Sequence, residues 1–91
     1  MNILDNRIIA ILRDVDAENI VDVINALVGG GIISIEIPLN HSTPAAKAAS
    51  LRTIQKSHET FGDQIFLGAG TILSPEEAEA AANAGAKYII S

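Results

Sequence analysis

The 91-residue chain contains no cysteine and no tryptophan. Without cysteine it can form neither a disulfide nor a thiolate for metal binding or nucleophilic catalysis. The chain has only six basic residues against eleven acidic ones, and its lysines and arginines form no cluster. This composition argues against a surface that binds nucleic acid or an anionic membrane. No run approaches the roughly 18 consecutive apolar residues of a membrane span, and the first residues lack the pattern of a signal peptide. We therefore expect a cytoplasmic protein without nucleic-acid or membrane partners.

What the chain does contain is a regular alternation of short apolar runs and helix-like segments. Hydrophobic residues make up 48% of the sequence and aromatic residues only 3%, a composition that suits a parallel sheet covered by alanine-rich helices. Aliphatic runs typical of buried strands lie at 8–12, 32–39, 65–69 and 88–90. Between them apolar residues recur at helical spacing, so the order β-α-β-α-β-α-β predicts an α/β fold with a parallel sheet.

Each intervening helix carries a start signal. Asp16, Thr43 and Ser74 are suited to cap a first helical turn, and proline follows Thr43 and Ser74 at the first helical position. The glycines at 29–31 are expected to end the first helix. The second helix is expected to face the core with residues that include Ala48, Ile54 and Gln55.

The stretch 74–77, Ser-Pro-Glu-Glu, has the form of a capping box. The Ser74 hydroxyl is expected to accept from the Glu77 amide while the Glu77 carboxylate reaches back. The glutamates of this first turn are otherwise interpreted as solvated residues that complement the helix dipole. His41 and His58 have no metal-ligating neighbours at ligand spacing, so we interpret both as surface residues and expect no metal site.

The last predicted strand is not followed by a helix, which would leave one face and one edge of the sheet uncovered. The simplest interpretation is that residues 1–91 form a single partial domain. That domain would be the N-terminal half of a TIM (β/α)₈ barrel, a fold that needs about 200–250 residues. A natural four-stranded parallel domain is the alternative.

Polar side chains fall at the carboxyl ends of three predicted strands: Arg13, Glu36 and Thr71. Ligands bind at this edge of parallel α/β folds. Glu36 is the most informative of them, because an unpaired buried charge costs about several kcal/mol and is therefore usually paired, solvated or chemically active. For Arg13, pairing with Glu36 and binding of a carboxylate or phosphate both stay open. Thr71 could simply cap the next turn.

Three segments at these strand ends resemble one known family. They are 9–13 (IAILR), 35–40 (IEIPLN) and 68–73 (GAGTIL), the last followed by Pro75-Glu76. In this order they resemble the 2-keto-3-deoxy-6-phosphogluconate/6-phosphogalactonate (KDPG/KDPGal) aldolases, and Pro-Leu-Asn after Glu36 resembles the galactonate branch. The resemblance implies a class I aldolase on a (β/α)₈ barrel. It also implies a homo-oligomer, usually a trimer, without metal or cofactor.

The resemblance implies a phosphorylated 2-keto-3-deoxy sugar acid as substrate. A strand lysine would form a Schiff base with it, and cleavage would give pyruvate and glyceraldehyde 3-phosphate. Glu36 would be the general acid/base, moving protons through a water. Arg13 and Thr71 would contact the keto-acid end. Asn40 stands where the gluconate branch has a carboxylate-binding arginine, and we place it with Gly70 among the substrate-binding residues.

The Schiff-base lysine of this family belongs to a strand in the second half of the barrel. We therefore expect the 91 residues alone to be inactive. Two other functions stay open. One is a different phosphate-handling barrel, of the phosphosugar epimerase or thiamine-phosphate synthase type, which also carries glycine-rich strand ends. The other is a non-enzymatic half-barrel that self-associates through its exposed strand edge.

Overall fold

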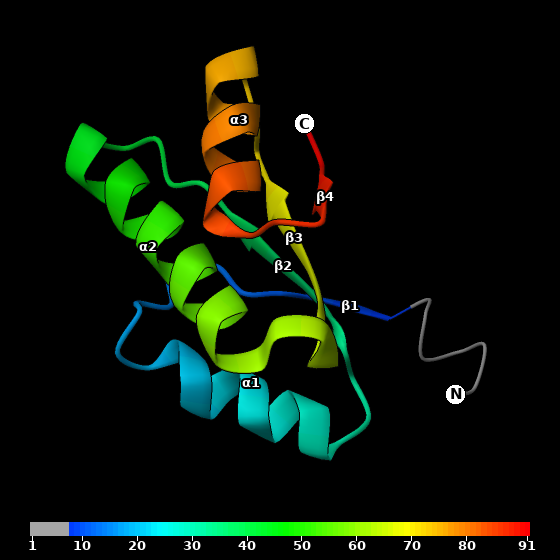
Figure 1. Cartoon of the computed structure of the whole chain (residues 1–91). Coiled ribbons are helices and arrows are strands. Elements are labelled where there is room, and N and C mark those ends of the chain that lie inside the picture. The colour runs from blue at the N-terminus through cyan, green and yellow to red at the C-terminus, as the bar shows by residue number, and fades with distance from the viewer. Residues whose placement is uncertain (1–7) are drawn as a thin grey trace.

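The computed structural model describes residues 8–91. The predicted alternation of strands and helices is confirmed (Figure 1). None of the helices in residues 8–91 combines the length and the apolar character that crossing a membrane requires. The elements are β1 (Ile9–Ile11), α1 (Ile20–Gly29), β2 (Ser34–Pro38), α2 (Pro44–Phe61), the short 3₁₀ helix η2 (Gly62–Gln64), β3 (Phe66–Gly70), α3 (Pro75–Ala84) and β4 (Tyr88–Ile89).

The four strands form one parallel sheet in the order β1-β2-β3-β4. The register pairs Ile11 with Glu36, and Glu36 with Gly68. Gly68 is in turn paired with Tyr88. Because successive side chains of a strand point to opposite faces, these four residues form one row on a single face of the sheet.

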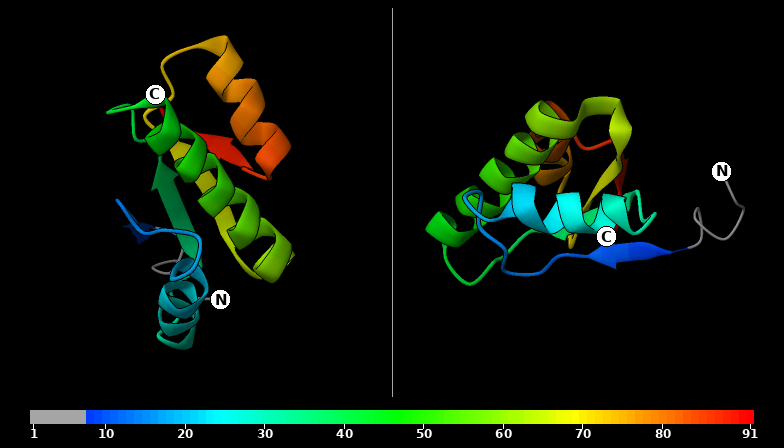
Figure 2. Two further views of the ribbon diagram at one scale, coloured as in Figure 1. Left: turned by 90° about the vertical axis from the view of Figure 1, so that its left-hand side faces the viewer. Right: turned by 90° about the horizontal axis from the view of Figure 1, so that it is seen from below.

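The other face of the sheet carries the hydrophobic core. Ile35 and Leu67 are at most 1% exposed and pack in one cluster with Ile24 of α1 and Ile54 of α2. The three helices lie on this side of the sheet (Figures 1 and 2). This one-sided cover follows from right-handed βαβ crossovers that all turn the same way.

The face that bears Glu36 is apolar but not covered by the described helices. Ile9, Ile11 and Phe66 on this face are 45%, 56% and 49% exposed. Glu36 itself is only 7% exposed, so neighbouring side chains enclose the one acidic residue of the face. The predicted placement of a carboxylate within a buried strand is confirmed.

The caps predicted for the second and third helices are confirmed. The Thr43 hydroxyl accepts a 3.0 Å hydrogen bond from the backbone of Ala46. The Ser74 hydroxyl accepts one of 3.1 Å from the backbone of Glu77. Caps of this kind contribute about 1 kcal/mol each, and here they fix where two helices begin beside the carboxyl ends of β2 and β3.

The first helix begins later than its cap signal suggests. The Asp16 carboxylate accepts from the backbone of Asn19 at 2.9 Å, but α1 begins at Ile20. Asp16 therefore caps a turn that leads into the helix. At the other end the chain turns through Gly31, whose φ is +91°, a conformation that favours glycine.

The predicted inward face of α2 is partly wrong. Ile54 is buried, but Ala48 and Gln55 are exposed. The core side instead includes Thr53 and Ser57, which are 2% and 0% exposed. Their hydroxyls donate to helix carbonyls one turn earlier, at 3.1 and 2.8 Å. Because these hydroxyls are satisfied within the helix, short polar residues occupy a core position at little cost.

Candidate active site

Glu36 lies on β2 with its carboxylate against the backbone of β3. A Cβ atom added to Gly70 would stand 2.7 Å from the Glu36 carboxyl carbon. Gly70 therefore leaves the space that the carboxylate fills, which is a reason for glycine distinct from turn formation. The sequence placed Gly70 among the substrate-binding residues; its observed neighbour is the proposed acid/base itself.

A second glycine, Gly68, makes room for an aromatic ring. A Cβ there would overlap the ring of Tyr88. The Tyr88 hydroxyl donates to the Ile35 carbonyl at 3.1 Å, and its ring stacks on Phe66 with centroids 4.8 Å apart. Burial, and then the negative charge of Glu36, raise the pKa of the Tyr88 phenol. Sequence reasoning missed Tyr88, because its position opposite Gly68 follows from the strand register, which the sequence does not give.

Glu36 does not form an ion pair with Arg13. Among residues 8–91 the ion pairs join Glu77 to His41 and Lys47, and Asp63 to Lys87. The interpretation of Glu36 as the partner of Arg13 is therefore wrong for this structure. Its side chain is instead buried, against Gly70 and on the same face of the sheet as Tyr88.

Arg13, Asn40 and Thr71 meet at the carboxyl edge of the sheet. They line one hollow of about 290 Å³ together with Pro38 and His41. Of the three strand-end residues predicted to meet, Arg13 and Thr71 line this hollow, while Glu36 is not among its lining residues. Glu36 stands two residues before Pro38 on the same strand, so its carboxylate lies one step deeper on the same face.

Two residues of this edge have left-handed backbone: Asp14 and Thr71, with φ values of +60° and +55°. Aspartate adopts this region more often than most residues, but a β-branched residue such as Thr71 rarely does, so the strain lies at Thr71. Strain of this kind costs on the order of 1–3 kcal/mol and gathers at functional sites. The helix after β3 is capped by Ser74 and not by Thr71.

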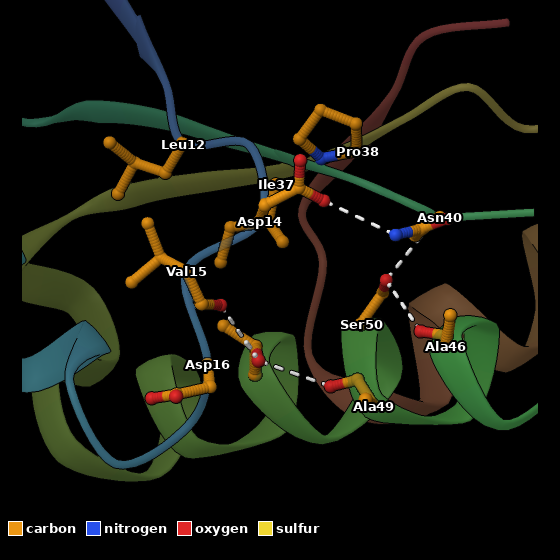
Figure 3. A pocket seen from close by; sticks show the side chains of 11 residues that line it. Leu12, Asp14, Val15, Asp16, Ile37, Pro38, Asn40, Ala46, Ala49 and Ser50 are labelled. Carbon is orange, nitrogen blue, oxygen red and sulfur yellow. Dashed lines mark hydrogen bonds between the residues drawn. The ribbon is translucent and has the colours of Figure 1, made fainter. Parts of the chain in front are cut away.

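The side chain of Asn40 organises the loop after β2. Its amide nitrogen donates to Asp14 at 3.2 Å and its oxygen accepts from the backbone of Ser42 at 2.9 Å. Its own backbone nitrogen donates to the Ser50 hydroxyl at 2.9 Å. Figure 3 shows the contacts of Asn40 with Asp14 and Ser50, which join two loops to α2. Asn40 therefore fixes the wall of the hollow that also contains Arg13.

A second, mostly apolar pocket lies on the helix side of Asn40. It has a volume of about 210 Å³. Leu12, Val15, Ile37 and Ser50 are among the residues that line it (Figure 3). Neither Arg13 nor Thr71 lines it, so the hollow with those two residues is the better candidate for binding a charged ligand.

Glu77 is not the solvated residue that the sequence suggested. Its side chain is 12% exposed, and its carboxylate lies 3.0 Å from His41 Nε2 and 3.2 Å from Lys47 Nζ. It also accepts from the backbone of Leu73 at 2.9 Å, one residue before the expected capping partner Ser74. Glu77 thereby ties the loop that carries His41 to the start of α3.

These contacts make Glu77 a source of acid sensitivity. The Leu73 amide, and next His41, lower the pKa of Glu77 from 4.5 to about 2. A carboxyl group with a lowered folded-state pKa adds stability above its unfolded pKa. That stability should be lost as the pH falls from 4.5 towards about 2. We expect Glu77→Gln to lower the unfolding midpoint at pH 7 and to flatten its fall in acid.

Thermal unfolding followed by circular dichroism between pH 7 and pH 2 would measure this. Glu76→Gln is the matched control, because Glu76 is the exposed neighbour in the same helical turn. An acid-induced fall as steep in Glu77→Gln as in the unaltered chain would contradict the assignment.

The carboxyl edge of the sheet combines the buried carboxylate of Glu36, the guanidinium of Arg13 and the hydroxyl of Thr71. Such a set can bind an anionic group and move a proton next to it. Within residues 8–91 no three His, Asp or Glu side chains gather where they could hold a metal ion.

Comparison with known proteins gives a consistent result. The family model described as KDPG and KHG aldolase matches residues 2–91. The chain is 32% identical over 84 residues to 2-dehydro-3-deoxy-6-phosphogalactonate aldolase of Escherichia coli K12, covering 92% of this chain and 38% of that protein. It therefore spans less than two fifths of the length of this relative.

Solved structures agree. The native KDPGal structure superposes with a TM-score of 0.76 at 31% identity, over 91% of this chain and 37% of the other. A KDPG aldolase from Legionella pneumophila, captured with pyruvate as a covalent carbinolamine intermediate, gives 0.76 at 30%, with the same coverage. The predicted fold class is confirmed: the parallel sheet with alternating helices matches the N-terminal half of this barrel. The chain belongs to the KDPG and KHG aldolase family.

Proposed function

We propose that this chain supplies one part of the active site of a Schiff-base aldolase. The reaction would cleave 2-keto-3-deoxy-6-phosphogalactonate or its gluconate epimer to pyruvate and glyceraldehyde 3-phosphate. The observation that carries the proposal is the Glu36 carboxylate, buried against Gly70 beneath a hollow lined by Arg13 and Thr71. The family match supports an aldolase in preference to the epimerase and thiamine-phosphate synthase types.

In this proposal Glu36 is the general acid/base. Imine formation needs a proton delivered to the departing water, and bond cleavage needs a proton removed from the substrate hydroxyl. A carboxylate can do both in turn if it is enclosed but reachable through a water. With an exposed fraction of 7%, Glu36 meets the first condition. In this proposal the water would enter from the hollow at the carboxyl edge, which Pro38 lines two residues further along the same strand.

Arg13, Asn40, Thr71 and Gly70 would form the substrate-binding part. The exposed guanidinium of Arg13 suits a carboxylate. Asn40 would act through the loop that it holds, because its amide nitrogen already donates to Asp14. The Asn40 position and the curated relative both support the galactonate substrate.

We also propose that the imine-forming lysine lies outside these 91 residues, which would then be one partial domain. Lys87 is at the start of β4 and donates to Asp63 and to the Ile65 carbonyl, both at 3.1 Å. Lys47 lies on α2 and forms an ion pair with Glu77. A nucleophilic lysine needs a desolvated place at the catalytic end of the barrel, and these two side chains are held elsewhere.

Self-association is a second candidate property. Ile9, Ile11 and Phe66 on the face of Glu36 are each about half exposed, and an apolar face of this kind favours contact with further protein. In a complete barrel this face would be the interior, so the trimer that the family resemblance implies would use another surface, whereas the isolated chain would bury the face against a second copy. Sedimentation equilibrium of the chain would show mass above the monomer, and a stable folded monomer would contradict it.

A chimera tests the proposed activity. The chain would replace the matched 84-residue segment of the E. coli aldolase. We expect the chimera to release pyruvate from 2-dehydro-3-deoxy-6-phosphogalactonate, and borohydride with pyruvate to trap an adduct on a lysine of the E. coli part. A folded chimera without pyruvate release would contradict the proposal.

The chain alone is the matched control. Borohydride and pyruvate should leave it unmodified, as read by mass spectrometry. A stable adduct on Lys47, Lys56 or Lys87 would overturn the assignment of the lysine to another segment.

A further inference from the structure

The ring of Tyr88, a residue of β4, lies over β3 at the position directly beside Glu36. The register pairs Glu36 with Gly68 and Gly68 with Tyr88. Since Gly68 has no side chain, the Tyr88 ring fills its position, where an added Cβ would overlap it. The ring thus crosses β3 and reaches β2, the strand of Glu36.

Two further contacts hold the ring in this position. Its hydroxyl donates to the carbonyl of Ile35, the residue before Glu36, at 3.1 Å. Its face stacks on Phe66, with an interplanar angle of 23°. Phe66 stands two residues before Gly68 on the same face, so the ring is supported from the amino-terminal side of the sheet.

The same face offers Glu36 a second position without a side chain. Gly70 stands two residues beyond Gly68, towards the carboxyl edge. The Glu36 carboxylate lies there, with its carboxyl carbon 2.7 Å from where a Gly70 Cβ would be. Of these two glycine positions, the ring fills that of Gly68, and that of Gly70 is left for the carboxylate.

We propose that Tyr88 is a positioning residue that keeps the Glu36 carboxylate on Gly70, at the edge where substrate would bind. This inference rests on the proposed role of Glu36. The ring does not take part in proton transfer: its hydroxyl is committed to the Ile35 carbonyl. Its effect is steric and electrostatic, because it blocks the deeper position and stands close to the carboxylate.

The chain offers a direct spectroscopic test. Tyr88 is the single tyrosine and there is no tryptophan, so absorbance near 295 nm reports on this phenol alone. Burial first, and then the Glu36 charge, raise the pKa of Tyr88. Glu36→Gln removes the carboxylate charge but leaves the Tyr88 phenol as buried as before. The phenol pKa should therefore fall, yet remain above its usual value. Glu79→Gln, which removes an exposed charge from α3, should leave it unchanged.

The position of the carboxylate itself can be measured by NMR on the full chain. A nuclear Overhauser contact between the Glu36 γ-methylene and the Gly70 α-protons marks the observed position. We expect Tyr88→Phe, which retains a ring, to keep this contact and Tyr88→Ala to lose it. In the chimera, Tyr88→Ala should lower kcat more than it changes KM, with activity restored in Tyr88→Phe.

The outcomes separate this inference from the proposed function. Persistence of the Glu36–Gly70 contact in Tyr88→Ala would overturn it. If the alanine variant does not fold, a phenol pKa that is the same in Glu36→Gln and in the unaltered chain would overturn it. Neither measurement depends on catalysis, so an inactive chimera would refute the aldolase proposal and leave the role of Tyr88 intact.

Discussion

Replacing Glu36 by glutamine is expected to lower the turnover of the chimeric aldolase by roughly 10²- to 10⁴-fold, the usual contribution of a general acid/base. Glutamine has nearly the same shape and fills the same space against Gly70, but it cannot take up or release a proton. The loss should fall on kcat, because the proposed substrate contacts lie with Arg13 and Thr71. Steady-state measurement of pyruvate release gives both parameters.

Two observations keep this result interpretable. Glu79→Gln removes one exposed carboxylate from α3 and should leave kcat unchanged. The unfolding midpoint of Glu36→Gln should be no lower than that of the parent, because a neutral amide costs less to bury than a carboxylate. A loss of kcat smaller than about tenfold would fall outside the range of acid/base catalysis and refute the role.

The prominence of Glu36 in the sequence has a physical cause. A charge within an apolar run is rare because burial penalises it. The same reasoning holds for the strand ends, since parallel strands separated by helices must bring their carboxyl ends to one edge. The meeting of Arg13 and Thr71 therefore followed from element order alone. The caps at Thr43 and Ser74 were equally predictable, because capping depends on residues close in sequence.

Contacts between distant segments were not predictable in this way. Tyr88 reaches the Ile35 carbonyl across 53 positions of the chain, and the pairing of Glu77 with His41 spans 36. Such contacts depend on strand register and on the angle between helices, which local patterns do not encode. Thr53 was missed for another reason: a hydroxyl satisfied within its own helix behaves as a core residue.

The glycines of β3 show the same limit in another form. A Gly-x-Gly sequence at a strand end predicts a turn, yet Gly68 and Gly70 are both strand residues without positive φ. Their lack of a side chain is used by Tyr88 and Glu36, which come from the two neighbouring strands. Only the register reveals which side chain fills each position.

Gly70→Ala is accordingly expected to separate activity from stability. The added methyl would overlap the Glu36 carboxylate, which is the far end of a flexible side chain and can rotate away. Displacement of a catalytic group by about 1 Å costs on the order of 10²-fold in rate. The free energy of unfolding should change by less than about 1 kcal/mol, because the backbone at Gly70 requires no special conformation. Turnover of the chimera and chemical denaturation would measure the two effects.

Gly29→Ala is the matched control for this substitution. Gly29 ends α1, and a Cβ there would meet no atom within 4 Å. This variant should retain full turnover and be as stable as the parent or slightly more so, because alanine favours a helix. If Gly70→Ala keeps the turnover of Gly29→Ala, the carboxylate does not act from the position it holds here. If instead Gly70→Ala loses turnover while its stability holds, catalysis requires the space that Gly70 leaves for the Glu36 carboxylate.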